Sequence, residues 1–264
     1  MVSAAADATL RHLRQEVATI EKNTGFSEDA GSLRLGLPAL DAALAGGLAR
    51  AALHELAPAA PAQFGAMTGF AFAISALARK DARSRPALVI QTDFSVQEAG
   101  ALYGPGLECL GLPMQRLILL RVPRPTDVLW AFEEALKSRA VAAVIAELPE
   151  AGAAADLVAT QRLALAARAG DGLGLLLRHR PSPLATAATT RWEIAASPSI
   201  PDRFGGLGRT SLELSLNRNK RGRCGRFGVC WDHHERVFLP ALSVGVAAAA
   251  FDGSPDPQPL VRIG

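Results

Sequence analysis

A strand, a loop and a helix are predicted in succession between residues 51 and 78, an order typical of phosphate-binding loops. The apolar run Ala51–Leu56 predicts the strand, Ala57–Gly65 forms the loop, and an apolar helical pattern extends from about Ala66 to Ala78. In such loops glycines let backbone N–H groups face the phosphates, a lysine reaches the outer phosphates, and a serine or threonine holds Mg²⁺. The loop is therefore the place where nucleotide chemistry would be expected.

The residues of this loop do not supply that chemistry. Pro58 and Pro61 have no N–H group to donate, no glycine opens the loop, and no Lys-Ser or Lys-Thr pair closes it. The first cation downstream, Arg79, lies near the far end of the helix, and Thr68 alone is a weak substitute. We therefore predict that the chain neither binds nor hydrolyses ATP, and that it has no catalytic residue and no cofactor.

Positive charge is most concentrated between Arg203 and Arg226, where seven Lys or Arg residues accompany one acid, Glu213. The pattern predicts an edge strand over Ser211–Leu216, a tight connection, and a returning strand over Gly225–Trp231. The charge fits a solvated turn that keeps a sheet edge from pairing with other chains. It also fits a surface that contacts single-stranded DNA phosphates or an acidic partner. The candidate nucleic-acid-binding residues are Arg209, Arg218, Lys220, Arg221, Arg223 and Arg226.

Metal binding is not supported by the four potential ligands near the end of this hairpin. Cys224, Cys230, His233 and His234 lie close together in the sequence, but their spacing fits no common zinc site. Adjacent strand residues also point to opposite faces of a sheet. The chain has three cysteines in all, too few for a disulfide framework, which fits a reducing cytosol.

The elements that would position these residues alternate between apolar strands and helical patterns, which predicts an α/β fold with a mostly parallel sheet flanked by helices. Buried strands are expected at residues 87–93, 117–120, 141–147 and 173–177. A helix over Val96–Leu110 is interrupted by Gly104-Pro105-Gly106, and Asp127 is placed to cap the helix that follows it. In that helix Trp130 is either a packing residue or a partner contact.

The two ends of the chain differ from this core. Residues 4–22 have an amphipathic helical pattern whose apolar seam is Leu10, Leu13, Val17 and Ile20. This seam either packs on its own domain or docks on a partner or a neighbouring copy. Residues 23–31 are polar and predict a linker. The tail from Pro240 is partly disordered after about Asp252, or becomes ordered on a partner.

Bulk properties narrow the class of protein. The 264 residues are 49% hydrophobic, enough to build a sizeable core, and the net charge of +3 permits a nucleic-acid partner without requiring one. The N-terminus has no apolar segment typical of a secretory signal, and the longest apolar runs, such as Ala241–Phe251, are too short to span a bilayer. We therefore expect a cytoplasmic protein with no membrane partner.

Eight short stretches between residues 31 and 238 form a combined pattern: Leu40-Asp41, Leu44, Gly46-Gly47-Leu48, Leu102–Leu107, Leu110–Leu112, Arg121–Pro125, Trp130–Leu136 and Trp231-Asp232-His233. Together they resemble the ImuA family, RecA-like and SulA-like accessory proteins of bacterial mutagenesis cassettes. The resemblance implies a RecA-like core over residues 31–239 that lacks a functional phosphate-binding loop and is closed by an antiparallel hairpin. An N-terminal helix and linker (1–30) precede it, and a C-terminal tail (240–264) follows it.

The resemblance also suggests roles for three charged residues. Asp93 stands near the position of the carboxylate that activates water in RecA-type cores, and Glu147 stands where a hydrolase holds Mg²⁺. Because no phosphate site accompanies them, we interpret both as strand-end acids that face solvent or cap a helix. Arg218 matches the basic residue that reaches a neighbouring subunit's nucleotide in active relatives, a role that requires a nucleotide.

The function that the resemblance implies is that of a non-catalytic RecA-like adaptor in SOS-induced, error-prone translesion DNA synthesis. The partners implied are an inactive Y-family polymerase homologue (ImuB-like) and an error-prone C-family polymerase, and RecA and single-stranded DNA are further candidate partners. Two alternatives are an atypical RecA-type ATPase and a SulA-like inhibitor of cell division that binds FtsZ. The loop residues disfavour the ATPase, and the stretches around Tyr103 and Trp130 favour the adaptor over the inhibitor.

Overall fold

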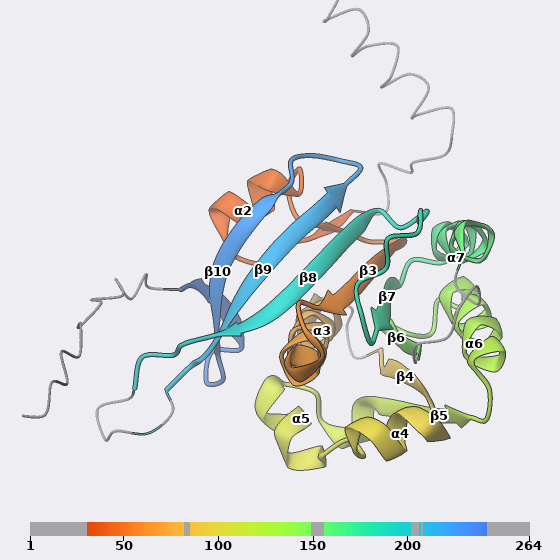
Figure 1. The fold of residues 1–264 in the computed structure, drawn as a ribbon, viewed down its shortest axis with the longest axis horizontal. Helices are drawn as coiled ribbons and strands as arrows, with labels where there is room; N and C mark the ends of the chain where they lie inside the picture. The colour runs from red at the N-terminus through yellow and green to blue at the C-terminus, as the bar shows by residue number, and fades with distance from the viewer. Residues whose placement is uncertain (1–30, 82–84, 149–155, 202–205, 207, 242–264) are drawn as a thin grey trace, which may run out of the picture.

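The computed structural model describes residues 31–81, 85–148, 156–201, 206 and 208–241 (Figure 1). The predicted N-terminal helix, with Leu10, Leu13, Val17 and Ile20, lies outside the described residues, as does the tail from residue 242 onward.

A nine-stranded sheet forms the centre of the fold, in the order β11-β10-β9-β8-β3-β7-β6-β4-β5. Six neighbouring strands are parallel, which confirms the mostly parallel sheet expected from the sequence; they are β3 (Ala52–Pro58), β4 (Ala87–Thr92), β5 (Leu117–Val122), β6 (Ala143–Leu148), β7 (Leu173–Arg178) and β8 (Thr190–Ser197). The remaining three are antiparallel, namely β9 (Thr210–Asn219), β10 (Gly225–Asp232) and β11 (Val237–Pro240). The predicted hairpin is therefore present as β9 and β10.

Helices cover both faces of the parallel strands, and the side chains of β6 show why. Its alternate residues belong to two cores, because successive strand residues point to opposite faces. Ala143 and Ile145 pack in the core beneath α3 (Phe64–Asp81), whereas Val144 and Ala146 pack in the core beneath α6 (Pro125–Lys137) and α7 (Leu157–Ala169). Figure 1 shows α6 and α7 side by side.

The antiparallel strands are attached to the parallel half through an aromatic cluster under α3. The Phe70 ring of α3 lies 6.0 Å from Trp192 of β8 and 5.6 Å from Phe238 of β11, measured between ring centroids. Trp231 of β10 meets Phe238 edge-on at 4.8 Å. These rings are almost fully buried, and offset or edge-on contacts are the geometry that aromatic rings prefer. The hairpin is thus part of the main core.

Shorter elements complete the amino end of the described chain. The helix α2 (Pro38–Ala43) is followed by the Gly46-Gly47 turn, and β1 (Ser32–Leu33) pairs with β2 (Leu48–Ala49). Gly47 has a φ of +132°, and a Cβ there would lie 2.5 Å from the Leu33 carbonyl oxygen. Only glycine fits this position, because side chains with a Cβ rarely adopt positive φ and would collide with the backbone.

α3 is a long and largely apolar helix. With the preceding turn η2 (Pro61–Gln63), the stretch Pro61–Lys80 is long and apolar enough to cross a membrane by length and composition, and half of it is buried inside the fold. The expectation that the longest apolar runs are too short to span a bilayer overlooked this stretch. Core helices pass the same test, and Met67, Phe70 and Ile74 are buried against the sheet.

Three local expectations were wrong. β5 was expected to be buried, but it forms an edge of the sheet with Ile118, Leu119 and Leu120 exposed. β9 was expected at an edge, but it lies between β8 and β10. The Gly104-Pro105-Gly106 stretch begins the separate helix α5 (Gly104–Leu110), because proline is favoured in the first helical turn; α4 (Asp93–Ala99) ends before it.

The helix α6 differs from expectation at Asp127 and distinguishes between the two alternatives for Trp130. Asp127 does not cap the helix; it lies in the first turn and accepts two hydrogen bonds, at 2.9 and 2.8 Å, from the Arg124 guanidinium. Trp130 is 66% exposed, so it does not pack inside the described part of the chain.

Candidate functional site

The loop after β3 has few backbone amides left for phosphate. Pro58 and Pro61 carry no N–H, Ala59 donates its N–H to the Ile194 carbonyl at 2.8 Å, and Gln63 donates its N–H to the Ala60 carbonyl at 2.8 Å. Four of the six residues from 58 to 63 therefore offer no N–H to a ligand. A phosphate-binding loop depends on such amides, so the backbone is unsuited to the task.

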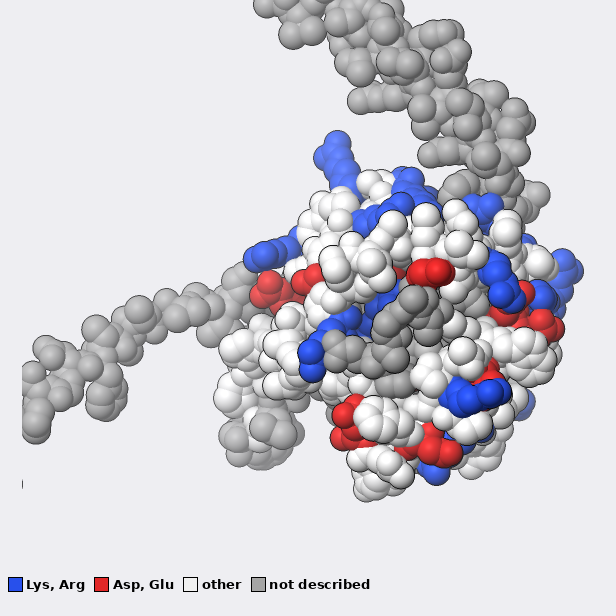
Figure 2. Space-filling view, turned by 45° about the vertical axis from the view of Figure 1, so that its right-hand side comes forward, with Lys and Arg blue, Asp and Glu red and all other residues white. Residues whose placement is uncertain are grey.

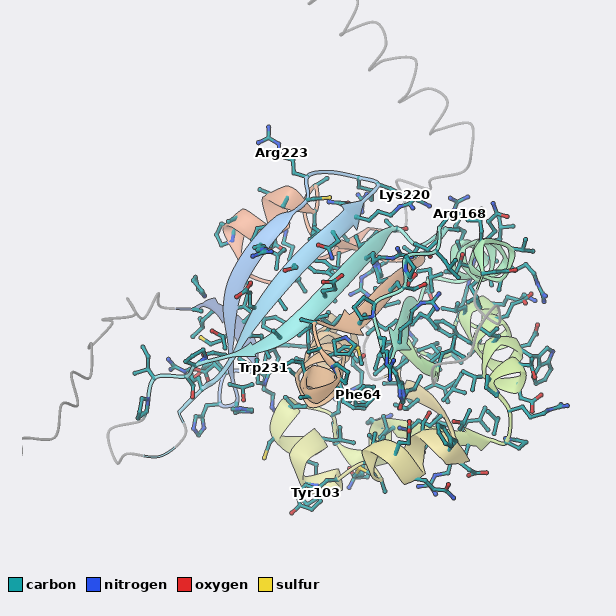
Figure 3. All side chains as sticks on the ribbon, in the orientation of Figure 1. Phe64, Tyr103, Arg168, Lys220, Arg223 and Trp231 are labelled. Atoms are coloured by element: carbon teal, nitrogen blue, oxygen red, sulfur yellow. The ribbon has the colours of Figure 1, made fainter. Side chains whose placement is uncertain are left out.

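The side chains of the loop are also engaged within the protein. Gln63 Oε1 accepts a hydrogen bond from the Ala196 N–H at 2.8 Å, and Thr68 Oγ1 donates to the Phe64 carbonyl at 2.9 Å. Phe64, the first residue of α3 (labelled in Figure 3), places its ring 4.6 Å from the His179 ring, measured between centroids. An aromatic ring thus begins the helix where a phosphate-binding loop would present its lysine.

The acidic residues near this loop differ in their surroundings. Glu147 is buried; its Oε2 accepts from Gln91 Nε2 at 2.7 Å, and its Oε1 lies 3.0 Å from His179 Nε2. The interpretation of Glu147 as a solvent-facing or helix-capping acid is therefore wrong, because side chains from β4 and the end of β7 enclose it. Asp93 is exposed at the start of α4, while the Thr92 side chain caps that helix.

A cavity of about 380 Å³ remains beside the loop, between α3, α4 and the end of β7. It is lined by Pro61, Phe64, Phe94, Glu98, His179 and Arg180 among others. His179 faces two carboxylates there, with Glu98 Oε2 3.7 Å from its Nδ1 and Glu147 on the other side of the ring. Aromatic and acidic groups in this position do not favour a triphosphate, because negative charge repels it.

The basic hairpin turn is fixed to the body of the protein rather than projecting freely. Asn219 Nδ2 donates to the Ala43 carbonyl at 2.8 Å, and the Arg223 N–H donates to the same oxygen at 3.0 Å. The Lys220 N–H donates to the Thr189 carbonyl at 3.0 Å. A Cβ on Gly222 would lie 2.1 Å from the Ala43 oxygen, so the turn rests directly on α2.

The structure separates the six predicted cations into three places. Arg221 and Arg223 are exposed on the turn, and Arg226 is exposed on β10, 4.0 Å from Glu213. Arg218 and Lys220 line a groove beside α7 instead. Arg209 does not join either group: it precedes the ten-residue strand β9, about 30 Å from the turn, and pairs with Asp232 at 2.9 Å. The cations are close in the sequence but far apart in space, because an extended strand places its two ends far from each other.

Lys220 is the least accessible of these cations. Its Nζ donates to the Ala187 carbonyl at 2.5 Å. Burial, and then the charges of Arg218 and Arg168, lower the pKa of Lys220. Arg168 was missed by sequence reasoning because it belongs to α7, about fifty residues earlier; Figure 3 shows it beside Lys220. Figure 2 shows Lys and Arg side chains along the upper rim of the molecule, with Asp and Glu mostly below them.

A buried ion cluster also escaped the sequence analysis. Glu55 of β3 is 1% exposed, and its Oε1 lies 2.6 Å from Arg178 Nε and 3.3 Å from Arg191 Nη2. Arg191 also donates to the Ser182 and Leu184 carbonyls, at 3.0 and 2.7 Å, which holds the segment between β7 and β8 in place. The signal was present in the sequence: an acid inside an apolar strand must find a partner.

Sequence comparison finds relatives over part of the chain. No model of a known protein family matches the sequence. Protein ImuA of Caulobacter vibrioides, in strains NA1000 / CB15N and ATCC 19089 / CIP 103742 / CB 15, is 38% identical over 136 residues, which is 47% of this chain and 54% of that protein. The match thus spans about half the length of the curated relatives.

Structural comparison establishes the fold. The crystal structure of the RadB recombinase matches with a TM-score of 0.54 and 14% sequence identity, covering 80% of this chain and 100% of that one. The chain therefore has a RecA-like core, as the resemblance implied: a mostly parallel sheet flanked by helices and closed by an antiparallel hairpin.

Proposed function

The similarity to Protein ImuA supports assigning this chain to the ImuA family, and on that premise we propose that it is a non-catalytic adaptor in SOS-induced, error-prone translesion DNA synthesis. Its partners in this proposal are an inactive Y-family polymerase homologue, an error-prone C-family polymerase and RecA. The RecA-like core acts as a rigid scaffold on which these proteins assemble.

The observation that carries the non-catalytic role is the state of the loop after β3. Its prolines, its internally bonded amides and the Phe64 ring leave a triphosphate without its usual donors or lysine. Glu147, at the position of the Mg²⁺-holding acid, has both carboxylate oxygens engaged with Gln91 and His179. We therefore propose an adaptor, because a RecA-like fold that has lost nucleotide binding still offers surfaces on which other proteins can bind.

Isothermal titration with ATP and Mg²⁺ tests the loss of nucleotide chemistry. We expect no heat beyond dilution and no phosphate release, whereas a RecA-type ATPase with an intact loop gives both in the same buffer. Micromolar binding accompanied by turnover above background would contradict the non-catalytic role and favour an atypical ATPase.

A second experiment tests the partners. The tagged chain is recovered from mutagen-treated cells and from untreated cells, and the bound proteins are identified by mass spectrometry. We expect the two polymerase-related proteins to be enriched after damage. Recovery of FtsZ without either of them would refute the adaptor role and favour a division inhibitor.

A further inference from the structure

Helix α7 has a second apolar stripe that the fold does not cover. One face of the helix packs on the sheet through Leu163, Ala166 and Ala167, which are buried. On the side facing away from the sheet, Leu157, Val158 and Leu165 are 42%, 62% and 62% exposed. A helix with only one packed face needs no leucine on its outer side, so this stripe indicates a docking surface.

The stripe forms one wall of a groove whose other wall is the end of β9. The groove has a volume of about 430 Å³ and runs along α7 from Leu157 to Arg168. The lining includes Arg168, at the C-terminal end of α7, together with Arg218 and Lys220, and none of the lining residues is acidic. Like charges this close favour an anionic group between them. The lining contains no aromatic residue, so it offers nothing on which nucleic-acid bases could stack.

The described chain begins close to this groove. The Arg50 N–H donates to the Gly31 carbonyl at 3.2 Å, and the adjacent Ala49 carbonyl lies 2.8 Å from His54 Nε2. His54 Nδ1 in turn lies 2.7 Å from the Thr190 hydroxyl, next to Thr189, which bonds the Lys220 N–H. The thirty residues before Gly31 therefore start near the cationic end of the groove.

The N-terminal segment matches the groove in length and charge. Its apolar seam from Leu10 to Ile20 would measure about 15 Å as a helix, and the α7 stripe from Leu157 to Arg168 measures about 16 Å. Glu21 borders the seam at its C-terminal end on a helical projection, Arg14 and Glu16 flank it on opposite sides further back, and Lys22 points away from it. The eight linker residues 23–30 can span up to about 28 Å, enough to bring Glu21 to the cations.

We propose that residues 4–22 dock as a helix in the groove of α7 of their own chain. Leu10, Leu13, Val17 and Ile20 then cover Leu157, Val158 and Leu165, and Glu21 lies among Arg168, Arg218 and Lys220. A short linker gives the segment an effective concentration in the millimolar range, which favours its own groove over that of a second copy. While docked, the seam is withheld from other proteins and the two hairpin cations are covered.

Hydrogen exchange measured by mass spectrometry on the full chain tests this docking. In the wild type we expect the amides of residues 8–20 to exchange at least about tenfold more slowly than in an unfolded chain, independently of protein concentration. Leu165→Glu should remove most of this protection, because it places a charge on the apolar stripe. Trp130→Glu is the matched control, since Trp130 is equally exposed on the neighbouring helix, and it should change nothing in residues 8–20.

A second variant keeps the test independent of any effect on folding. Glu21→Lys leaves the described core untouched and should raise exchange in residues 8–20 by about two- to fivefold, because it repels the three cations. Circular dichroism confirms that each variant remains folded. Exchange of residues 8–20 at unfolded rates in the wild type would overturn the proposal. Protection that Leu165→Glu leaves intact would also overturn it, as would protection that appears only with dimerisation.

Discussion

His54 makes the stability of this protein sensitive to mild acid. It lies in β3 with no exposed surface, and both of its ring nitrogens are hydrogen-bonded. Nε2 is 2.8 Å from the Ala49 carbonyl, which can only accept, so Nε2 carries a hydrogen. Trp192 Nε1 donates to the Thr190 hydroxyl at 2.6 Å, and that hydroxyl in turn donates a hydrogen bond to Nδ1 at 2.7 Å. The network thus suits a neutral histidine.

The cost of protonating this ring follows from its pKa. Burial lowers the pKa of His54 from 6.5 to about 4; the Ala49 carbonyl opposes this, and the charge of Arg221 on the hairpin adds to it. The unfolded chain therefore binds a proton near pH 6.5, whereas the folded chain does not until about pH 4. Stability from this residue is fully present above pH 6.5 and is lost as the pH falls toward 4. At about 1.4 kcal/mol per pH unit, the loss between pH 7 and pH 4.5 is roughly 2–3 kcal/mol.

Urea unfolding followed by circular dichroism at pH 7, 6, 5 and 4.5 measures this loss. His54→Gln should lower the free energy of unfolding at pH 7. It should also remove the loss of roughly 2–3 kcal/mol that the wild type shows between pH 7 and pH 4.5. His234→Gln is the control, because His234 is exposed, and it should keep the wild-type dependence. If the wild type and His54→Gln lost stability in parallel between pH 6.5 and 4.5, the reasoning would be refuted.

Two further predictions concern charges on and inside the sheet. Replacing Arg221 and Arg223 with Ala should weaken binding of a labelled single-stranded oligonucleotide and reduce the slope of log affinity against log salt by about one to two units, measured by fluorescence anisotropy. Arg209→Ala, at the far end of β9, is the control and should leave the slope unchanged. Equal slopes for the wild type and both variants would indicate that the turn is a solvated loop that does not contact DNA. Glu55→Gln should lower the free energy of unfolding by about 3–5 kcal/mol, because Arg178 and Arg191 keep their charges in a buried site. Glu213→Gln, on an exposed carboxylate, should stay within about 0.5 kcal/mol, and a similarly small effect of Glu55→Gln in the same urea titration would disprove the importance of the cluster.

The hairpin shows which features a local sequence pattern predicts and which it does not. Alternation over Ser211–Leu216 predicted a strand and the glycines predicted its return, and both strands are present. The same pattern could not tell that β9 lies inside the sheet, because a strand's neighbours depend on segments far away in the sequence. Nor could it tell that Lys220 turns toward the Ala187 carbonyl, whereas Arg209 lies at the other end of the strand.

The sequence by itself predicts that the chain lacks nucleotide chemistry, and it indicates the class of its fold. A phosphate-binding loop needs particular residue types in one short stretch, so the prediction from Ala57–Gly65 rests on a local property that can be read without the fold. Continuous apolar strands likewise require burial on both faces, which a parallel sheet covered by helices provides.

Only the tertiary structure decided which charged residues meet. Glu147 and His179 are 32 residues apart in the sequence, and Lys220 and Arg168 are 52 apart, yet each pair is close in space. Their meeting depends on strand order, and on where α7 crosses the sheet. Such contacts arise from the packing of whole elements, and the energy of that packing is spread over many side chains, so no short stretch of sequence carries it.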